Sequence, residues 1–280
     1  MKNRNIFKDF TRTEVLLLVL SVLTIIAVFC IFDRTNYLAL TASLIGVVSL
    51  IFNAKGNPLG QLLILIFCVL YGIISLSYAY YGEMITYLGM TAPMAFISLI
   101  TWLKHPYNGK KSEVQINSIH KKEIFVMFLL AAIVTVVFYF ILKAFNTNNI
   151  IPSTISVTTS FVAAYLTYRR SPYFAIAYAL NDIVLIILWT LASIENLSYL
   201  SVLCCFSVFL INDLYAFFNW LRIQKRQTSD TTAKNWLINW QMKFNFNSNL
   251  FGTEKINEKT HHPFNDVFFL FWQIKKKDFS

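Results

Sequence analysis

Residues 14–32 read EVLLLVLSVLTIIAVFCIF, and this run decides the fold class because Glu14 is its only charged residue. A helix of about 20 mainly apolar residues crosses the roughly 30 Å hydrocarbon layer of a bilayer. Further runs of this kind follow, so the chain is predicted to be an all-α polytopic membrane protein with eight transmembrane helices. The predicted helices are residues 14–32, 37–54, 58–80, 84–103, 123–145, 150–168, 172–192 and 197–221.

The composition agrees with this prediction. Hydrophobic residues make up 56% of the chain and charged residues 14%, whereas a soluble domain has about 25% charged residues. The runs do not alternate in polarity as the strands of a membrane barrel do. The first run could belong to a signal peptide, but it continues to Phe32 without a small-residue cleavage site. The net charge of +10 is typical of basic cytoplasmic loops. We therefore expect a lipid bilayer as partner and no nucleic acid.

The charges between the runs predict the orientation of the helices. Basic residues precede the first run and recur at Lys55, within residues 104–122, at Arg169–Arg170 and after residue 221. The connections between these basic ones are neutral or acidic. All basic clusters fall on one side of the membrane only if there are eight helices with both termini cytoplasmic. We therefore expect a multi-pass protein of the cell membrane.

The sequence offers no recognisable catalytic or metal-binding motif. Cys30, Cys68, Cys204 and Cys205 lie in apolar runs without a CxxC or Cys/His spacing. Residues 109–112 lack the upstream glycine of a phosphate loop, and no Ser/His/Asp or paired-carboxylate arrangement is evident. We expect no enzymatic activity, no cofactor and no metal, and keep a membrane-embedded enzyme as an alternative.

Two groups of three helices carry similar markers. A proline, Pro58 or Pro172, stands at the start of the third and seventh helices, where its missing N–H costs nothing. The fourth and eighth helices end with Trp102 and Trp220, and indole rings favour the membrane interface. These markers predict two parallel three-helix repeats with substrate bound between them. The alternative is that such common markers coincide by chance.

The repeats define the predicted domain organisation. Residues 1–35 form an N-terminal segment with the extra first helix. The core at 36–226 divides into a repeat at 36–104, a linker loop and helix at 105–148, and a repeat at 149–226. Residues 227–280 form a tail rich in Asn, Phe and Lys, which we expect to be disordered or to include an interfacial amphipathic stretch near 234–245. The short apolar run at 267–272 cannot span a bilayer.

Polar residues at membrane depth are the first candidates for a binding site. Asn181 and Asp182 lie about ten residues into the seventh helix, which is near the membrane midplane. Asn212 and Asp213 lie at a similar depth in the eighth helix. Polar groups at this depth are costly and often line solute pathways. The alternative is that they only hydrogen-bond neighbouring helices.

Helical spacing adds aromatic and amide side chains to these candidates. They are Tyr178 and Trp189 on the face of Asp182, Tyr215 on the face of Asn212, and Gln61 and Tyr71 on one face of the third helix. Aromatic rings would stack on a flat solute, while amides and carboxylates would bond its amide and ribose groups. A cationic ring would also be attracted to the aromatic faces and carboxylates. Packing or interfacial anchoring is the alternative for each tyrosine.

Several of these residues lie in segments that resemble the PnuC family of vitamin transporters. The matching segments are Asn53–Pro58, Tyr71, Tyr81–Met84, Pro93–Met94, Trp102–His105, Ala164–Leu166, Arg169–Arg170, Asp182, Trp189 and Tyr215–Trp220. The resemblance covers residues 36–226 or so. It implies a three-plus-one-plus-three helix core, akin to the sugar-transporting SWEET proteins, and a homo-trimer.

The resemblance also implies a function. The family carries out facilitated, energy-independent uptake of nicotinamide riboside, a precursor of NAD, by alternating access. This chain has Ala175 and Tyr178 where the family often has a W-x-x-W pair, and Ala95 where a polar residue is common. Thiamine or riboflavin therefore remain alternative substrates, and a vitamin-binding subunit of an ATP-driven transporter remains an alternative role.

Overall fold

The computed structural model describes residues 10–32, 34, 36–77, 80–147, 149–195 and 197–250. The elements are α1 (Arg12–Phe32), α2 (Tyr37–Ala54), α3 (Leu59–Ser77), α4 (Tyr81–Thr86), the π-helix η2 (Tyr87–Thr91), α5 (Ala92–Lys104), β1 (Pro106–Tyr107), β2 (Lys110–Val114), α6 (Lys121–Ala144), α7 (Ile150–Tyr168), α8 (Phe174–Glu195), the 3-10 helix η3 (Leu197–Tyr199) and α9 (Leu200–Leu250). The strands β1 and β2 form a short antiparallel hairpin.

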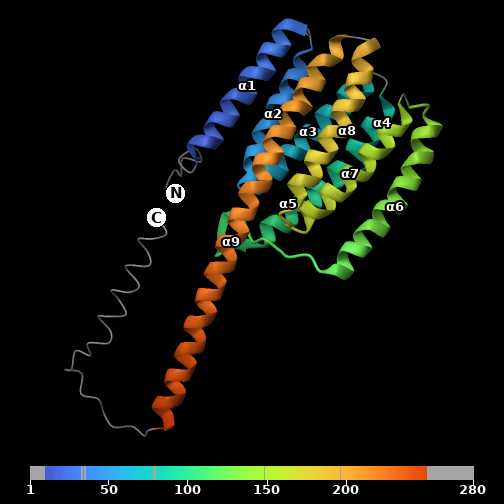
Figure 1. Ribbon diagram of the computed structural model, residues 1–280. Coiled ribbons are helices and arrows are strands. Elements are labelled where there is room, and N and C mark those ends of the chain that lie inside the picture. The colour runs from blue at the N-terminus through green and yellow to red at the C-terminus, as the bar shows by residue number, and fades with distance from the viewer. Residues whose placement is uncertain are drawn as a thin grey trace. The chain divides into compact units, whose positions relative to one another are not determined.

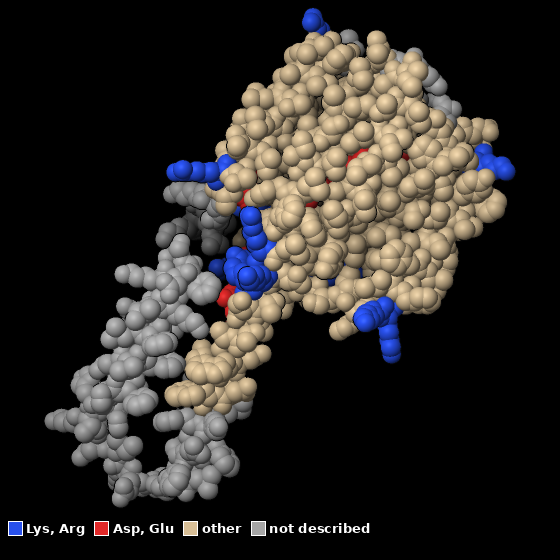
Figure 2. Space-filling model, in the orientation of Figure 1, with Lys and Arg blue, Asp and Glu red and all other residues tan. Residues whose placement is uncertain are grey.

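Within these described ranges, eight helices are long and apolar enough to cross a membrane when α4, η2 and α5 are counted as one. Each predicted transmembrane helix corresponds to one of them, so the predicted all-α fold class is confirmed. Most boundaries differ by a few residues, as when the fourth helix begins at Tyr81 instead of residue 84, but the last helix continues to Leu250 and the predicted end at residue 221 was wrong. On the face shown in Figure 2, Lys and Arg side chains lie mainly at the margins of a broad band with few charges.

The fourth crossing is interrupted by one turn of π-helix, and its cause lies in the sequence. Pro93, near the start of α5, has no N–H to donate to the carbonyl of Gly89 four residues earlier. The backbone widens there into η2, and the Thr91 hydroxyl donates to the carbonyl of Thr86 at 3.2 Å. Single π-turns occur frequently at functional sites. This turn places Tyr87 in the buried interior.

Following the predicted repeat, we call α2–α3–α4/α5 the first triplet and α7–α8–α9 the second triplet. The helix α2 packs on α3, α7 packs on α8, and α5 contacts both α3 and α7. The helices α1 and α6 lie on opposite sides of the bundle, against α2 and α7 (Figure 1). Both keep rows of exposed apolar side chains, including Leu23 on α1 and Phe125 on α6, as expected of helices that face lipid. The end of the bundle with β1 and β2 is called the hairpin end, and the opposite end the far end.

The helix corners at Gly56 and Arg170 have the same main-chain geometry. Both residues adopt left-handed conformations, with φ values of 66° and 58°. In each corner this residue donates its N–H to the carbonyl three residues back, and the next residue donates to the carbonyl five residues back. This is the Schellman type of helix end, and a proline precedes the next helix in both cases, Pro58 by one residue and Pro172 by two. The match supports the predicted repeat.

Two tryptophans exchange hydrogen bonds between the triplets. The Trp102 indole donates from Nε1 to the carbonyl of Thr167 at 2.9 Å, and the Trp220 indole donates to the carbonyl of Asn53 at 2.8 Å. Asn53 and Thr167 hold the same place, one residue before the last of α2 and α7. Both indoles are fully buried and their ring centroids lie 5.4 Å apart. Each triplet therefore caps the first helix of the other.

The linker also joins the two corners. Residues 113–117, which we call the strap, run from β2 toward α6. The Val114 N–H donates to the carbonyl of Gly56 at 2.9 Å, and the Asn117 N–H donates to the carbonyl of Arg170 at 3.1 Å. Those carbonyls belong to the two equivalent left-handed residues. The strap thus connects the triplets at matching backbone atoms.

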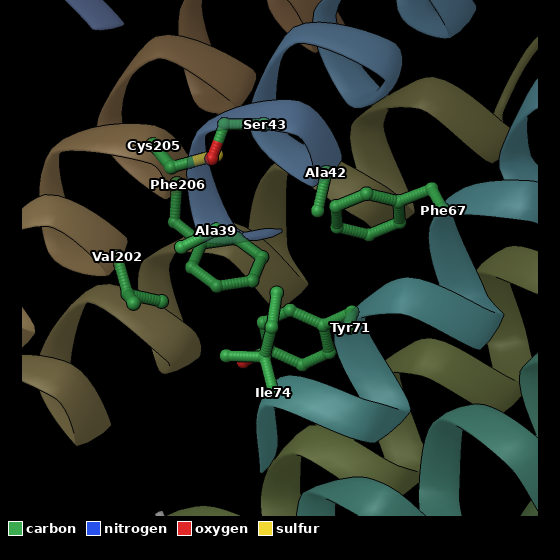
Figure 3. Close-up of a pocket in the computed structure, with 9 residues that line it drawn as sticks. All are labelled: Ala39, Ala42, Ser43, Phe67, Tyr71, Ile74, Val202, Cys205 and Phe206. Atoms are coloured by element: carbon green, nitrogen blue, oxygen red, sulfur yellow. The ribbon is translucent and has the colours of Figure 1, made fainter. Parts of the chain in front are cut away.

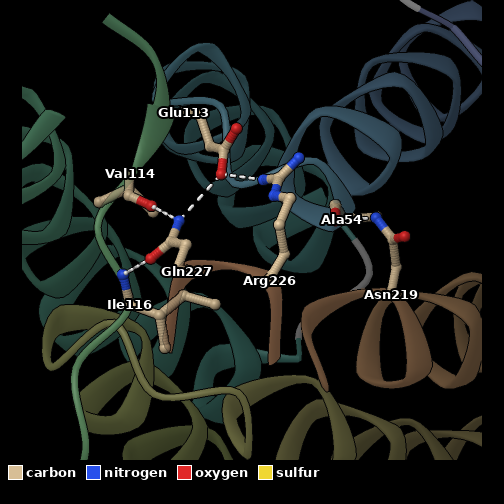
Figure 4. A network of polar contacts seen from close by, with 7 residues as sticks. All are labelled: Ala54, Glu113, Val114, Ile116, Asn219, Arg226 and Gln227. Atoms are coloured by element: carbon tan, nitrogen blue, oxygen red, sulfur yellow. Dashed lines mark hydrogen bonds and ion pairs between the residues drawn. The ribbon is translucent and has the colours of Figure 1, made fainter. Parts of the chain in front are cut away.

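Side chains of α9 hold the strap in place (Figure 4). Gln227 accepts the Ile116 N–H at 2.8 Å and donates to the Val114 carbonyl at 3.0 Å. It also donates to Glu113 at 2.9 Å, and Glu113 forms an ion pair with Arg226. The Gln227 amide thus bonds both an N–H and a carbonyl of the strap. Main-chain and side-chain contacts together close the hairpin end.

The tight corner between α2 and α3 supports a testable prediction. A Cβ at Gly60 would lie only 2.6 Å from the backbone nitrogen of Asn53, which cannot rotate away. We expect Gly60→Ala to lower stability by about 1–3 kcal/mol through overpacking. The apparent melting temperature of the detergent-purified protein would measure this effect. Gly89→Ala is the matched control, because its nearest contact would be 3.8 Å away; an equal loss in both variants would contradict the prediction.

The chain divides into two compact units, residues 1–229 and 230–280. The second unit begins within α9, whose helix is described to Leu250, with Trp236 and Trp240 exposed. The stretch near 234–245 is therefore helical, while its predicted interfacial role stays a prediction. The expected disorder beyond residue 250, and the apolar run at 267–272, lie outside the described residues.

Candidate functional site

The polar centre of the bundle is a pair of aspartates on neighbouring helices. Asp182 lies near the middle of α8 and Asp213 lies on α9. Each side chain is only 3% exposed, and the two carboxyl groups are within hydrogen-bonding reach of each other. The sequence predicted that the two aspartates lie at similar depth, but it did not predict their contact. The structure brings the two together.

The pair lacks a positive partner. In the part of the chain that the structure describes, no Lys, Arg or His side chain is among the groups that interact with either carboxyl. The Oδ2 atom of Asp182 is buried without a hydrogen-bond partner. Buried acids are normally paired with a cation or hydrogen-bonded, because an isolated charge in an apolar medium is costly. A buried pair of acids in such surroundings suits a ligand that carries a positive charge.

Asn181 supports the site from the side. Its Oδ1 accepts hydrogen bonds from the hydroxyls of Thr159 and Ser160 on α7, at 2.8 and 2.9 Å. These bonds fix the rotation of α8 against α7. The neighbouring Asp182 then points away from α7, because successive residues on a helix are about 100° apart. Asn181 is therefore a positioning residue in this arrangement.

An aromatic cluster extends from the aspartates toward the far end. The Trp189 indole donates to the Tyr71 hydroxyl at 3.0 Å, and both residues are buried. Tyr87 lies 4.3 Å from the Tyr71 ring, and Phe206 packs edge-on to Tyr71 at 5.7 Å. Tyr87 also interacts electrostatically with Asp182. Trp189 and Tyr71, both predicted from sequence, are thus held together beside the acidic pair.

A small pocket opens beside this cluster. It is lined by residues of α2, α3 and α9: Ala39, Ala42, Ser43, Phe67, Tyr71, Ile74, Val202, Cys205 and Phe206. In Figure 3 the Phe67, Tyr71 and Phe206 rings border the same space. Cys205 in its wall interacts electrostatically with Asp182. A flat solute entering here would meet aromatic rings before the aspartates.

Tyr178 adjoins the pair on the hairpin side. It lies one turn before Asp182 on α8 and packs edge-on to Phe174. Its hydroxyl hydrogen-bonds with the side chain of Thr167, and the ring interacts electrostatically with both aspartates. Tyr178 therefore separates the acidic pair from the tryptophan contacts of the hairpin end.

Three predicted site residues lie elsewhere. The Asn212 amide donates to the Ser21 hydroxyl on α1 at 3.0 Å and to the carbonyl of Val208. Tyr215 hydrogen-bonds with the side chains of Thr11 and Glu14, also at α1. These two residues attach α1 to α9. We omit both from the proposed site, and their predicted contact with substrate stays untested.

Gln61 is the third of these residues. Its amide donates to Asn53 Oδ1 at 2.8 Å within the α2–α3 corner. Since the Trp220 indole bonds the carbonyl of the same Asn53, Gln61 belongs to the contacts that close the hairpin end. We therefore omit Gln61 from the proposed site as well.

Sequence reasoning missed Glu83 and Tyr87. Glu83 on α4 is 1% exposed, its Oε2 has no hydrogen-bond partner, and it interacts electrostatically with Tyr71 and Tyr87. Glu83 lies on α4 just before η2 and Tyr87 is the first residue of η2, where the wider π-turn shifts the helical phase of the crossing. The proline was the only sequence signal of that shift.

The bond between Trp189 and Tyr71 supports a further prediction. Tyr71→Phe keeps the ring but leaves the buried indole N–H without its acceptor, which costs about 1–3 kcal/mol. We expect a decrease in ligand affinity of roughly fivefold or more, since 1 kcal/mol is about a factor of five. Tryptophan-fluorescence titration of the purified protein would measure it. Tyr139→Phe on α6 is the control, because Tyr139 is 39% exposed; unchanged affinity in Tyr71→Phe would refute a role for this bond.

The chain is similar to known membrane transporters in sequence and in structure. A family model described as nicotinamide mononucleotide transporter matches residues 36–222. The nicotinamide riboside transporter PnuC of Neisseria mucosa is 28% identical over 231 residues, covering 80% of this chain and 87% of that protein. A crystal structure of the vitamin B3 transporter PnuC matches with a TM-score of 0.68 at 25% identity, covering 78% of this chain and 94% of that one.

Proposed function

Because the chain belongs to the nicotinamide mononucleotide transporter family, we propose that it carries nicotinamide riboside across the cell membrane by facilitated diffusion. The single observation that supports this substrate most is the Asp182–Asp213 pair, which is buried beside the Tyr71–Trp189 cluster with no cationic partner among the described residues. Nicotinamide riboside has a flat pyridinium ring with a positive charge. Such a ring is attracted both to aromatic faces and to carboxylates.

The route across the membrane follows from the two triplets. The contacts of Trp102, Trp220 and the strap close the hairpin end, while the small pocket lies among far-end portions of α2, α3 and α9. We infer that the triplets rock against each other to expose the aspartates alternately to the two sides. The basic residues Lys55, Arg169 and Arg226 lie at the hairpin end. Because cytoplasmic loops collect Lys and Arg, we propose that this end faces the cytoplasm and that both termini are cytoplasmic. A homo-trimer remains our proposal from family resemblance.

Uptake into proteoliposomes tests this proposal. Purified protein reconstituted without ATP should take up labelled nicotinamide riboside, and the flux should saturate and be inhibited by unlabelled substrate. Flux of thiamine or riboflavin in its place would reject the substrate. Binding without flux would instead favour a vitamin-binding subunit of an ATP-driven transporter.

A further inference from the structure

A third buried acid lies apart from the aspartate pair. Glu83 on α4 is 1% exposed, and its Oε2 atom has no hydrogen-bond partner among the described residues. Buried polar atoms in proteins are nearly always hydrogen-bonded, because leaving one bare costs free energy. Acidic side chains within membrane-spanning helices are also rare and often lie on solute pathways. The bare oxygen of Glu83 is therefore a place for a hydrogen-bond donor that comes from a ligand.

The position of Glu83 on its helix directs the side chain into the bundle. The N–H of Tyr87 donates to the carbonyl of Glu83, so the two residues are one turn apart and lie on the same face. Tyr87 packs against the Tyr71 ring at 4.3 Å, and Glu83 interacts electrostatically with both tyrosines. The preceding residue faces elsewhere, since a Cβ on Gly82 would lie 2.6 Å from Leu142 of α6. Glu83 thus reaches the aromatic cluster.

Glu83 and Asp182 lie at different levels of this cluster. The hydroxyl of Tyr71, which interacts with Glu83, accepts the hydrogen bond of the Trp189 indole. Trp189 follows Asp182 by seven residues on α8, which is about 10 Å along the helix axis. Tyr87 interacts electrostatically with both acids. The rings therefore have one acidic side chain toward the membrane midplane and another toward the far end.

Two acids at separate levels suit a solute with two chemically different parts. A positively charged ring is attracted to aromatic faces and to the aspartate pair. Ribose hydroxyls are hydrogen-bond donors, and carboxyl oxygens accept such bonds. An acidic side chain that bonds a ribose hydroxyl is a common feature of dinucleotide-binding proteins. Glu83 can supply this second contact without any change in the charge of the aspartates.

We propose that Glu83 is a specificity-determining residue that accepts hydrogen bonds from the ribose hydroxyls of the substrate. This inference rests on the proposed function. The pyridinium ring lies against the aromatic faces beside Asp182, and the ribose extends from it toward the far end. A ligand without these hydroxyls leaves the Oε2 atom of Glu83 bare. A buried polar group that loses its partner in this way discriminates strongly against the wrong ligand. Glu83 therefore selects the riboside over the ring alone.

Isothermal titration calorimetry of the full-length protein in detergent tests the proposal with two ligands. One is nicotinamide riboside, and the other is its dideoxy analogue, which keeps the charged ring but lacks both secondary ribose hydroxyls. We expect the wild-type protein to bind the riboside roughly tenfold or more tightly than the analogue, as for a hydrogen bond to a carboxylate. Glu83→Met has a similar length but no oxygen, so it should bind both ligands with the affinity that the wild type has for the analogue.

A conservative variant and a control separate this role from a structural one. Glu83→Gln keeps a side-chain oxygen that accepts hydrogen bonds, so it should restore a preference for the riboside. Thr101→Ala on α5 should bind both ligands like the wild type, because the Thr101 hydroxyl only donates to the carbonyl of Ile97 at 2.9 Å.

The outcomes that overturn the proposal are distinct from those that overturn the transport function. Equal affinity of the wild type for the two ligands would refute the ribose contact without need of any variant. A Glu83→Met protein that still prefers the riboside, or that loses affinity for both ligands by the same factor, would refute the role of Glu83. If nicotinamide riboside does not bind the wild-type protein, the proposed substrate itself is wrong.

Discussion

Asp182→Asn is expected to weaken binding of nicotinamide riboside by roughly 30-fold or more, because losing a buried opposite charge costs about 2 kcal/mol or more. The substitution preserves size and leaves an amide, which cannot balance the pyridinium charge. Equilibrium binding measured by fluorescence or calorimetry, and uptake into proteoliposomes, should both decrease. Binding of the uncharged reduced form of nicotinamide riboside should change much less.

Thr190→Ala provides a matched control for this variant. Thr190 lies on the same helix as Asp182, but it is exposed and its hydroxyl only donates to the carbonyl of Ile186 one turn earlier. Affinity and uptake should stay at the wild-type level. If Asp182→Asn binds the cationic vitamin with wild-type affinity, the acidic pair serves only to pack the helices together.

Trp220→Ala is expected to have the second large effect, this time on stability. It removes a fully buried indole that packs 4.7 Å from the Phe174 ring and bonds the carbonyl of Asn53. Truncation of a buried tryptophan costs about 3–5 kcal/mol. The apparent melting temperature in detergent, read by size-exclusion chromatography after heating, should fall markedly.

The two tryptophans provide an internal comparison. Because Trp102 and Trp220 make equivalent bonds to opposite triplets, Trp102→Ala should lower the melting temperature by a similar amount. Phe218→Ala on α9 is the control, since Phe218 is 58% exposed and faces outward. If Phe218→Ala lowered the melting temperature as much as either tryptophan variant, the loss of stability would come from truncating any large side chain and not from losing the exchanged hydrogen bonds.

The helices were predictable from sequence because continuous apolar runs have few alternatives in a membrane. The resemblance to the PnuC family, read from short segments between Asn53 and Trp220, was confirmed by the family match over residues 36–222. The depth of Asp182 and Asp213 was also predictable, since it follows from counting residues along each helix. Their contact was not, because it depends on how each helix is rotated by packing.

Helix rotation also explains why some predicted site residues do not lie at the Asp182–Asp213 pair. Asn212 and Asp213 are neighbours in sequence, but about 100° apart on the helix, so Asn212 contacts Ser21 while Asp213 contacts Asp182. Gln61 lies on the face of Tyr71, yet more than two turns away, where the close approach of Asn53 decides its partner. Side-chain partners of this kind depend on tertiary contacts that no local pattern encodes.

The exchanged indole bonds also set the order in which the protein can be completed during synthesis. Trp102 needs the carbonyl of Thr167, which is added 65 residues later, and the Asn53 carbonyl receives its indole only when Trp220 is made, 167 residues later. A nascent chain that has inserted only its first triplet therefore carries an open donor, the Trp102 indole, and an open acceptor, the Asn53 carbonyl, at the hairpin end. A chain that stops before α9 therefore lacks the indole that bonds the end of α2.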